Sequence, residues 1–119
     1  MAYVDGFVLV VPTRKLGAYR RMSAKAGKVW KEYGALEYRE CVGDDLQTEH
    51  GLPFQKLVKP KRGESVVFSW IVYKSRADRK KVLAKVMKDK RLADMMDPKK
   101  LPFDGKRMFW GGFKPIVSM

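Results

Sequence analysis

Residues 65–73 read Ser-Val-Val-Phe-Ser-Trp-Ile-Val-Tyr and form the clearest strand signal in the chain. β-Branched and aromatic side chains dominate this stretch, and these are the side chains that a pleated sheet favours. Residues 3–11 are similar, because apolar side chains such as Val8 and Leu9 alternate onto both faces. A strand that is apolar on both faces is covered on both faces in the folded protein. The two strands therefore predict a sheet that needs a cover on each side.

Two helices are expected to supply one of these covers. Residues 14–33 place apolar side chains at three- and four-residue steps, which predicts an amphipathic helix that ends at Gly34. Residues 75–91 predict a second helix, in which Ser75 is the N-cap and Asp78 completes a capping box. The buried stripe of this second helix is expected to comprise Val82, Leu83, Val86 and Met87.

The remaining segments complete a regular order. Residues 35–42 and 106–113 predict two further strands, whereas 92–105 is expected to be irregular. The long connection 43–64 is expected to carry a short helix of its own. The resulting order, β-α-β-β-α-β, predicts a single α+β domain over residues 1–119 with the ferredoxin-like fold. In that fold a four-stranded antiparallel sheet carries both helices on one face.

The second face of the sheet then lacks a cover, because no third long helix is predicted. The simplest cover is a second copy of the same sheet, packed across a two-fold axis. The sequence therefore predicts that the partner of this chain is the chain itself, in a homodimer.

The chain is strongly basic. Its 119 residues include 26 basic and 13 acidic side chains, which give a net charge of +13. Each of the segments 14–33 and 75–91 carries a net charge of +6, so the two predicted helices hold nearly all of this charge on the outside of the dimer. We interpret it as a solvated surface, and binding to nucleic acid or another anionic surface through these helices is the alternative.

Several classes of protein are not expected. The N-terminal residues 1–7 lack the basic region of a signal peptide, and no apolar run is long enough to insert into a membrane. We therefore expect a soluble cytoplasmic protein. No phosphate-binding loop, dinucleotide fingerprint or serine-nucleophile motif is present, so no cofactor is expected. His50 lies near Asp44, Asp45 and Glu49, which we interpret as a solvated loop and not as a metal site.

Some polar side chains interrupt the apolar strands. Asp5, Glu40 and Ser69 lie in the first, second and third predicted strands, respectively. A polar group that faces the interior needs a partner, so these three residues are candidates for a functional site. Cys41 is interpreted as a small packed residue and not as a nucleophile.

A second set of candidates precedes the last strand. Asp104 is followed by Gly105, a pair typical of a turn, and then by Lys106 and Arg107, so that an ion pair is expected here. Trp70 is a further candidate for lining a cavity. For both Trp70 and Trp110 the interpretation that we favour is core packing.

Three motifs resemble a known family. They are Tyr3-Val4-Asp5-Gly6-Phe7, Val67-Phe68-Ser69-Trp70-Ile71, and Leu101-Pro102-Phe103-Asp104-Gly105-Lys106-Arg107-Met108 followed by Gly111-Gly112-Phe113. They are similar to the YbaA-like family of small bacterial proteins. The resemblance extends almost from end to end, although the helices of this chain are richer in lysine and arginine.

This resemblance implies a dimeric α+β barrel and no assigned activity or catalytic residue. Our leading hypothesis is a small-molecule site in a cavity between the paired sheets. The alternatives are an anionic-surface or nucleic-acid binder and an accessory dimer without a ligand. The sequence does not decide whether the protein is an enzyme.

Overall fold

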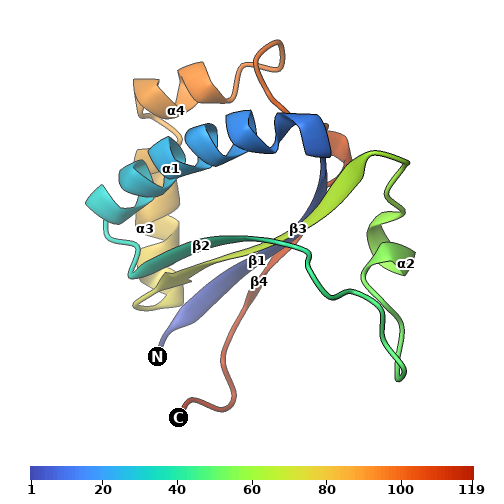
Figure 1. The fold of residues 1–119 in the computed structure, drawn as a ribbon. Coiled ribbons are helices and arrows are strands. Elements are labelled where there is room, and N and C mark those ends of the chain that lie inside the picture. Colours follow the sequence, from blue (N-terminus) through green and yellow to red (C-terminus); the bar gives the residue numbers. More distant parts are fainter.

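The computed structural model describes residues 1–119 as an α+β fold in which one four-stranded sheet carries helices on one side (Figure 1). All strand pairs are antiparallel, and the strand order is β2-β3-β1-β4. The predicted α+β class and the four-stranded antiparallel sheet are confirmed. The strands are β1 (Tyr3–Pro12), β2 (Glu37–Val42), β3 (Glu64–Tyr73) and β4 (Phe109–Phe113). The helices are α1 (Leu16–Glu32), α2 (Gln55–Val58), α3 (Arg76–Val86) and α4 (Lys90–Met95), with 3-10 turns at Thr13–Lys15 and Gly105–Arg107.

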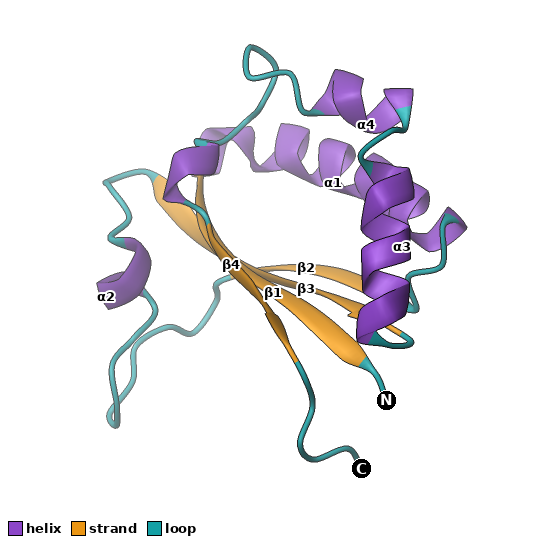
Figure 2. Cartoon of the chain, turned by 180° about the vertical axis from the view of Figure 1, so that it is seen from behind, coloured by secondary structure: helices purple, strands orange, loops and turns teal.

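Helices α1 and α3 cover one face of the sheet, and α4 lies against α1 (Figure 2). The main core fills the space between these helices and the sheet, with Val29 of α1, Ile71 and Tyr73 of β3, and Val82 and Val86 of α3 all buried. Helix α1 ends as predicted at Gly34, whose backbone φ of +120° is a conformation that favours glycine.

The second predicted helix is interrupted, which corrects the expectation of one helix over 75–91. Ser75 does cap α3, because its hydroxyl accepts a hydrogen bond from the backbone N–H of Asp78. Helix α3 stops at Val86, however, and a new helix begins after Asp89, whose carboxylate accepts from the backbone N–H of Arg91. An aspartate is more stable at an N-cap than in a helix interior, so it breaks the helix here.

The break changes which side chains are buried. Met87 was expected in the core but is 63% exposed, because the chain leaves the helix at this residue. Leu92 of α4 is buried instead, in a segment for which no helix was expected. No helix of the protein is long and apolar enough to cross a membrane.

The opposite face of the sheet is only partly covered, and we call it the open face. The segment 43–63 folds over one end of it, where Val58 of α2 packs against Val8, Val10 and Val66. The expected short helix in this connection is thus confirmed, and the chain covers part of the open face by itself. The rest of this face exposes large apolar side chains, namely Phe68 (41%), Phe109 (48%) and Phe113 (62%).

One buried ion pair ties the helical layer to the sheet. Asp5 of β1 is 1% exposed, and its Oδ1 accepts from Arg79 of α3 at 2.7 Å (Nη2) and 2.9 Å (Nε). Its Oδ2 accepts from the Tyr73 hydroxyl at 3.0 Å, and that hydroxyl in turn accepts from Trp30 Nε1 of α1 at 3.2 Å. Burial and the Asp5 charge raise the pKa of Tyr73, so its hydroxyl stays a donor. Four elements therefore meet at one carboxylate.

We expect Arg79→Ala to lower the free energy of unfolding by about 3 kcal/mol, because the substitution leaves the Asp5 carboxylate buried without its cation. Urea denaturation measures this change. Arg76→Ala, in the same helix and without an ion pair, is the control and should alter stability by less than about 0.5 kcal/mol. Equal effects of the two substitutions would show that the Asp5 pair does not anchor α3.

Candidate functional site

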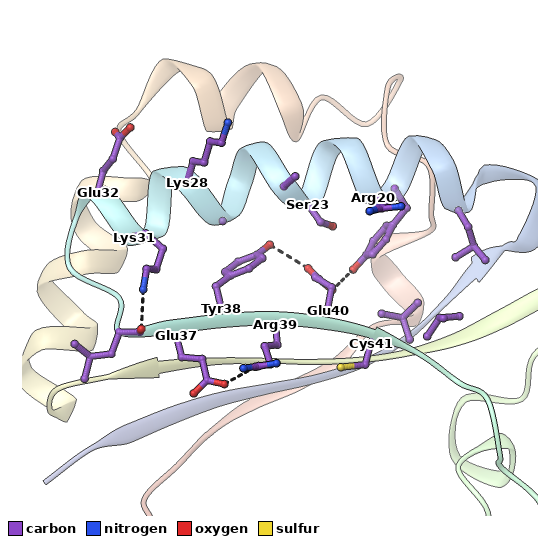
Figure 3. Close-up of a pocket in the computed structure, with 17 residues that line it drawn as sticks. Arg20, Ser23, Lys28, Lys31, Glu32, Glu37, Tyr38, Arg39, Glu40 and Cys41 are labelled. Atoms are coloured by element: carbon purple, nitrogen blue, oxygen red, sulfur yellow. Dashed lines mark hydrogen bonds and ion pairs between the residues drawn. The ribbon is translucent and has the colours of Figure 1, made fainter.

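A cavity of about 960 Å³ lies between α1 and β2, on the helical side of the sheet. The sequence placed the site between two paired sheets instead, a location that requires a second chain and stays a prediction. Figure 3 shows Tyr38 and Glu40 on the side of β2 that faces α1, with Ser23 pointing toward them from the helix. Eight of the 17 residues that line the cavity are hydrophobic, so its wall is mixed in character.

Glu40 is the polar centre of the cavity. Its Oε1 accepts a hydrogen bond from the hydroxyl of Tyr19 at 2.7 Å, and its Oε2 accepts from the hydroxyl of Tyr38 at 3.0 Å. Burial raises the pKa of both phenols, and the negative charge of Glu40 raises it further, with a small opposing effect of the Ser23 hydroxyl. Both phenols are therefore fixed as neutral donors to the carboxylate.

Ser23 is the unsatisfied group of the cavity. Its side chain is only 4% exposed, and its Oγ has no hydrogen-bond partner. A buried hydroxyl without a partner costs about 1–3 kcal/mol. It lies beside the hydroxyls of Tyr19 and Tyr38, so a small shift of either phenol gives it a partner.

The ring of Tyr38 packs against Gly27 of α1. A Cβ atom at Gly27 would lie 2.8 Å from Cδ1 and 3.0 Å from Cε1 of that ring, so only glycine allows this approach. The ring also packs at an angle on Trp30, with 6.1 Å between the ring centroids. Gly27 weakens the helix locally, but it leaves the space in which the Tyr38 ring packs and forms one wall of the cavity.

Several residues that line the cavity are basic side chains of α1, namely Arg20, Lys28 and Lys31. Figure 3 shows Lys31 reaching to β2, where it donates to the carbonyl of Leu36 at 2.8 Å, and Lys28 extending from the opposite side of α1. Arg20 and Lys28 form no ion pair within the chain. Glu32, which also lines the cavity, is paired with Arg91 at 2.7 Å. Lys31 likewise forms no ion pair, so three basic side chains without an acidic partner line the cavity.

The candidate residues in the strands lie on two different faces of the sheet. Glu40 lines the cavity, and Ser69 is its cross-strand neighbour on β3, buried at 5% beneath the helices. Asp5 lies in the anchoring ion pair. Trp70 faces the other way, onto the open face, where its Nε1 donates to Glu37 at 3.2 Å.

The candidates of the Asp104 turn lie apart from the cavity. Asp104 accepts from the backbone N–H of Lys106 and so caps the short turn, as the Asp-Gly pair predicts. The expected ion pair forms with a different acid, because Arg107 contacts Glu64 of β3 at 2.6 Å. This hydrogen bonding lowers the pKa of Glu64 to about 2. The Lys106 side chain is exposed.

Two expectations of core packing are wrong. Cys41 is exposed, because β2 is an edge strand and this part of the open face has no cover. Trp110 is 57% exposed on the edge strand β4, where it stacks on Phe7 and lies 6.0 Å from the guanidinium of Arg79. No group of three or more His, Cys, Asp and Glu side chains is placed to hold a metal ion.

Sequence reasoning missed Tyr19, Ser23 and Tyr38 as site residues. Tyr19 falls on the apolar stripe that the periodicity of residues 14–33 predicts, and a tyrosine on that stripe can be either a core residue or a hydrogen-bond donor. The signal that was available is Glu40 itself. A carboxylate on the helical face of a strand needs donors, and the helix that lies above it must supply them.

Comparison with known proteins agrees with the predicted resemblance. The family model described as "Protein of unknown function (DUF1428)" matches residues 2–105. The chain belongs to the DUF1428 family. It is 45% identical over 118 residues to "Uncharacterized protein YbaA" of Escherichia coli (strain K12), with 99% of each chain covered, and equally to that of Shigella flexneri. The predicted YbaA-like resemblance is confirmed.

A solved structure supports the fold of this DUF1428 chain. The structure of Rv0793 from Mycobacterium tuberculosis aligns with a TM-score of 0.57 over 99% of this chain and 98% of that chain. The sequence identity is 14%, so this similarity concerns the fold alone.

We expect Gly27→Ala to destabilise the protein by about 1–3 kcal/mol, because the added methyl group overlaps the Tyr38 ring. Gly17→Ala in the same helix is the matched control. The nearest atom to its new Cβ is the flexible end of Arg21 at 3.5 Å, so this substitution should stabilise the helix by up to about 1 kcal/mol. Thermal unfolding of both variants provides the comparison, and equal stabilisation would contradict the close approach of Tyr38.

Proposed function

We propose that this protein binds a small organic molecule in the cavity between α1 and β2, and that it does so as a cytoplasmic homodimer. One observation carries the first part of this proposal. A half-buried carboxylate, two neutral phenols and an unpartnered serine hydroxyl converge on one cavity. A few converging polar groups beside apolar wall residues are typical of ligand sites.

The open face supports the homodimer. Its exposed aromatic side chains line a second, shallower apolar hollow of about 750 Å³ with Val4, Trp70 and Val72. At its β2 edge Arg39 pairs with Glu37 at 2.7 Å, whereas the two long helices on the other side of the sheet carry many unpaired basic side chains. Two copies with a charge of +13 each repel one another least when they meet through the face that carries the fewest basic side chains. A second copy is therefore the occupant that fits.

We further propose that the domain is of the ferredoxin-like type and pairs as an α+β barrel. The strand order β2-β3-β1-β4, with α1 and α3 on one face, supports the first part. Sheet-to-sheet packing through the open face would bury its aromatic side chains.

A second candidate function is binding to nucleic acid or another anionic surface. The exposed lysines and arginines of α1 and α3 that make no ion pairs favour it, among them Arg21, Lys25, Lys80 and Lys81. The salt dependence of duplex DNA binding tests it, because phosphate contacts weaken steeply as salt rises. We rank it below the cavity, since no exposed aromatic side chain accompanies these charges on α1 or α3.

The ligand proposal predicts that protein purified without denaturant carries a small molecule, which native mass spectrometry detects as added mass on each chain. Ala24→Trp should remove this mass, because Ala24 is an exposed residue at the cavity wall and an indole there blocks it. Ala18→Trp is the matched control, since Ala18 is exposed on the same helix outside the cavity. A wild-type chain without added mass, in which no compound of a fragment library shifts the amide signals of α1 and β2, would contradict the proposal.

The dimer proposal predicts that Phe68→Glu weakens self-association by more than about 30-fold, because a charge replaces an apolar contact at the centre of the open face. Sedimentation velocity over a range of concentrations measures this change. Met87→Glu, which alters an exposed apolar side chain at the C-terminal end of α3, should leave the dimer intact. A wild-type monomer at micromolar concentration, or a Phe68→Glu dimer of unchanged affinity, would contradict this interface.

A further inference from the structure

We propose that the group recognised in the cavity is an organic ammonium, held by the carboxylate of Glu40. This inference rests on the proposed function, because it names the class of ligand for the same site. It concerns the floor of the cavity, where Glu40, Ser23, Tyr19 and Tyr38 meet.

Glu40 differs from the other acids of the four strands, because Asp5, Glu37 and Glu64 each have an arginine within 2.7 Å. Glu32, which also lines the cavity, is paired with Arg91 at 2.7 Å. No lysine, arginine or histidine nitrogen lies within 4.0 Å of Glu40. In a chain with 26 basic residues, this carboxylate is held in place by neutral donors alone.

The two phenols leave capacity on the carboxylate. An ionised carboxylate has about four acceptor positions, and the phenols occupy one on each oxygen. A ligand in the cavity displaces water from the remaining positions, and a carboxylate covered in this way requires a positive or hydrogen-bonding partner. An anionic group at this depth would meet the Glu40 charge and be repelled.

The surroundings favour an ammonium over a neutral donor. The hydroxyl oxygens of Tyr19 and Tyr38 lie against the two carboxylate oxygens, and each hydroxyl can still accept a hydrogen bond. An ammonium carries three N–H donors, so it can bond the carboxylate and a phenol oxygen together, whereas an alcohol carries one donor. The apolar part of the wall then contacts the carbon skeleton of the ligand.

The basic side chains at the opening of the cavity indicate which chemical group the other end of the ligand can carry. Arg20 and Lys28 form no ion pair and lie at the opening on α1. A cation that carries an anionic group at its far end would satisfy both ends of the cavity, and a simple amine would satisfy only the floor. The negative charge of Glu40 at the floor, however, is what favours an ammonium over an alcohol or a carboxylate.

Three compounds of similar size that share a phenyl body test the inference: phenethylamine, 2-phenylethanol and 3-phenylpropionate. Titration followed by amide NMR shifts of α1 and β2 gives the three affinities. We expect phenethylamine to bind at least 10-fold more tightly than 2-phenylethanol, and 3-phenylpropionate to bind most weakly. An alcohol or a carboxylate that binds as tightly as the amine overturns the ammonium assignment and leaves the cavity as a ligand site.

Two variants separate charge from structure. Glu40→Gln keeps the shape of the side chain and should reduce phenethylamine affinity at least 10-fold while leaving 2-phenylethanol affinity within about twofold, which also shows that the variant is folded. Glu32→Gln, which removes a carboxylate at the mouth, should change amine affinity by less than about twofold. Equal losses in the two variants, or no shift from any of the three compounds at millimolar concentration, overturn the inference. The mass retained by the purified wild-type protein decides separately whether the cavity binds a ligand at all.

Discussion

The arrangement of the helical layer depends on one buried carboxylate. Asp5 lies in the middle of the sheet and is fully neutralised by Arg79 from α3, while Tyr73 transmits the contact to Trp30 of α1. A buried charge tolerates few geometries, because leaving it unpaired costs several kcal/mol. Apolar packing alone allows helices to slide over a sheet, whereas this network fixes both α1 and α3 relative to β1 and β3.

A second carboxylate has the opposite character, and the contrast defines the site. Asp5 is closed off and has its cation, whereas Glu40 faces a cavity and has only neutral donors. The first anchors the end of α1 near Trp30, and the second meets α1 near Tyr19, so the helix spans the cavity between two fixed points. Gly27 allows the Tyr38 ring to approach between them. The cavity thus exists because α1 is attached to the sheet at two separate points. Its floor is negatively charged because Glu40 has no cationic partner.

The sequence predicted the features that depend on repeating patterns. Strand alternation in residues 65–73 and 3–11, together with helical periodicity in 14–33, identified the sheet and α1 because each pattern extends over many residues. The features that it missed depend on single contacts. Asp89 ends one helix and begins another through one side-chain hydrogen bond, and Cys41 is exposed because its strand lies at an edge. Glu40 was recognised as a candidate from its strand, but its donor Tyr19 comes from α1, a helix whose rotation about its axis the sequence does not define to within one residue.

The central claim is that the cavity between α1 and β2 is a binding site whose floor is the uncompensated Glu40. A crystal structure of the protein as purified from cells, at a resolution that shows individual side-chain atoms, tests it most directly. The account predicts electron density of a non-protein molecule with a nitrogen or other donor atom within hydrogen-bond distance of Glu40. Density showing that Arg20, Lys28 or a side chain of a second copy fills the cavity and pairs with Glu40 would contradict it.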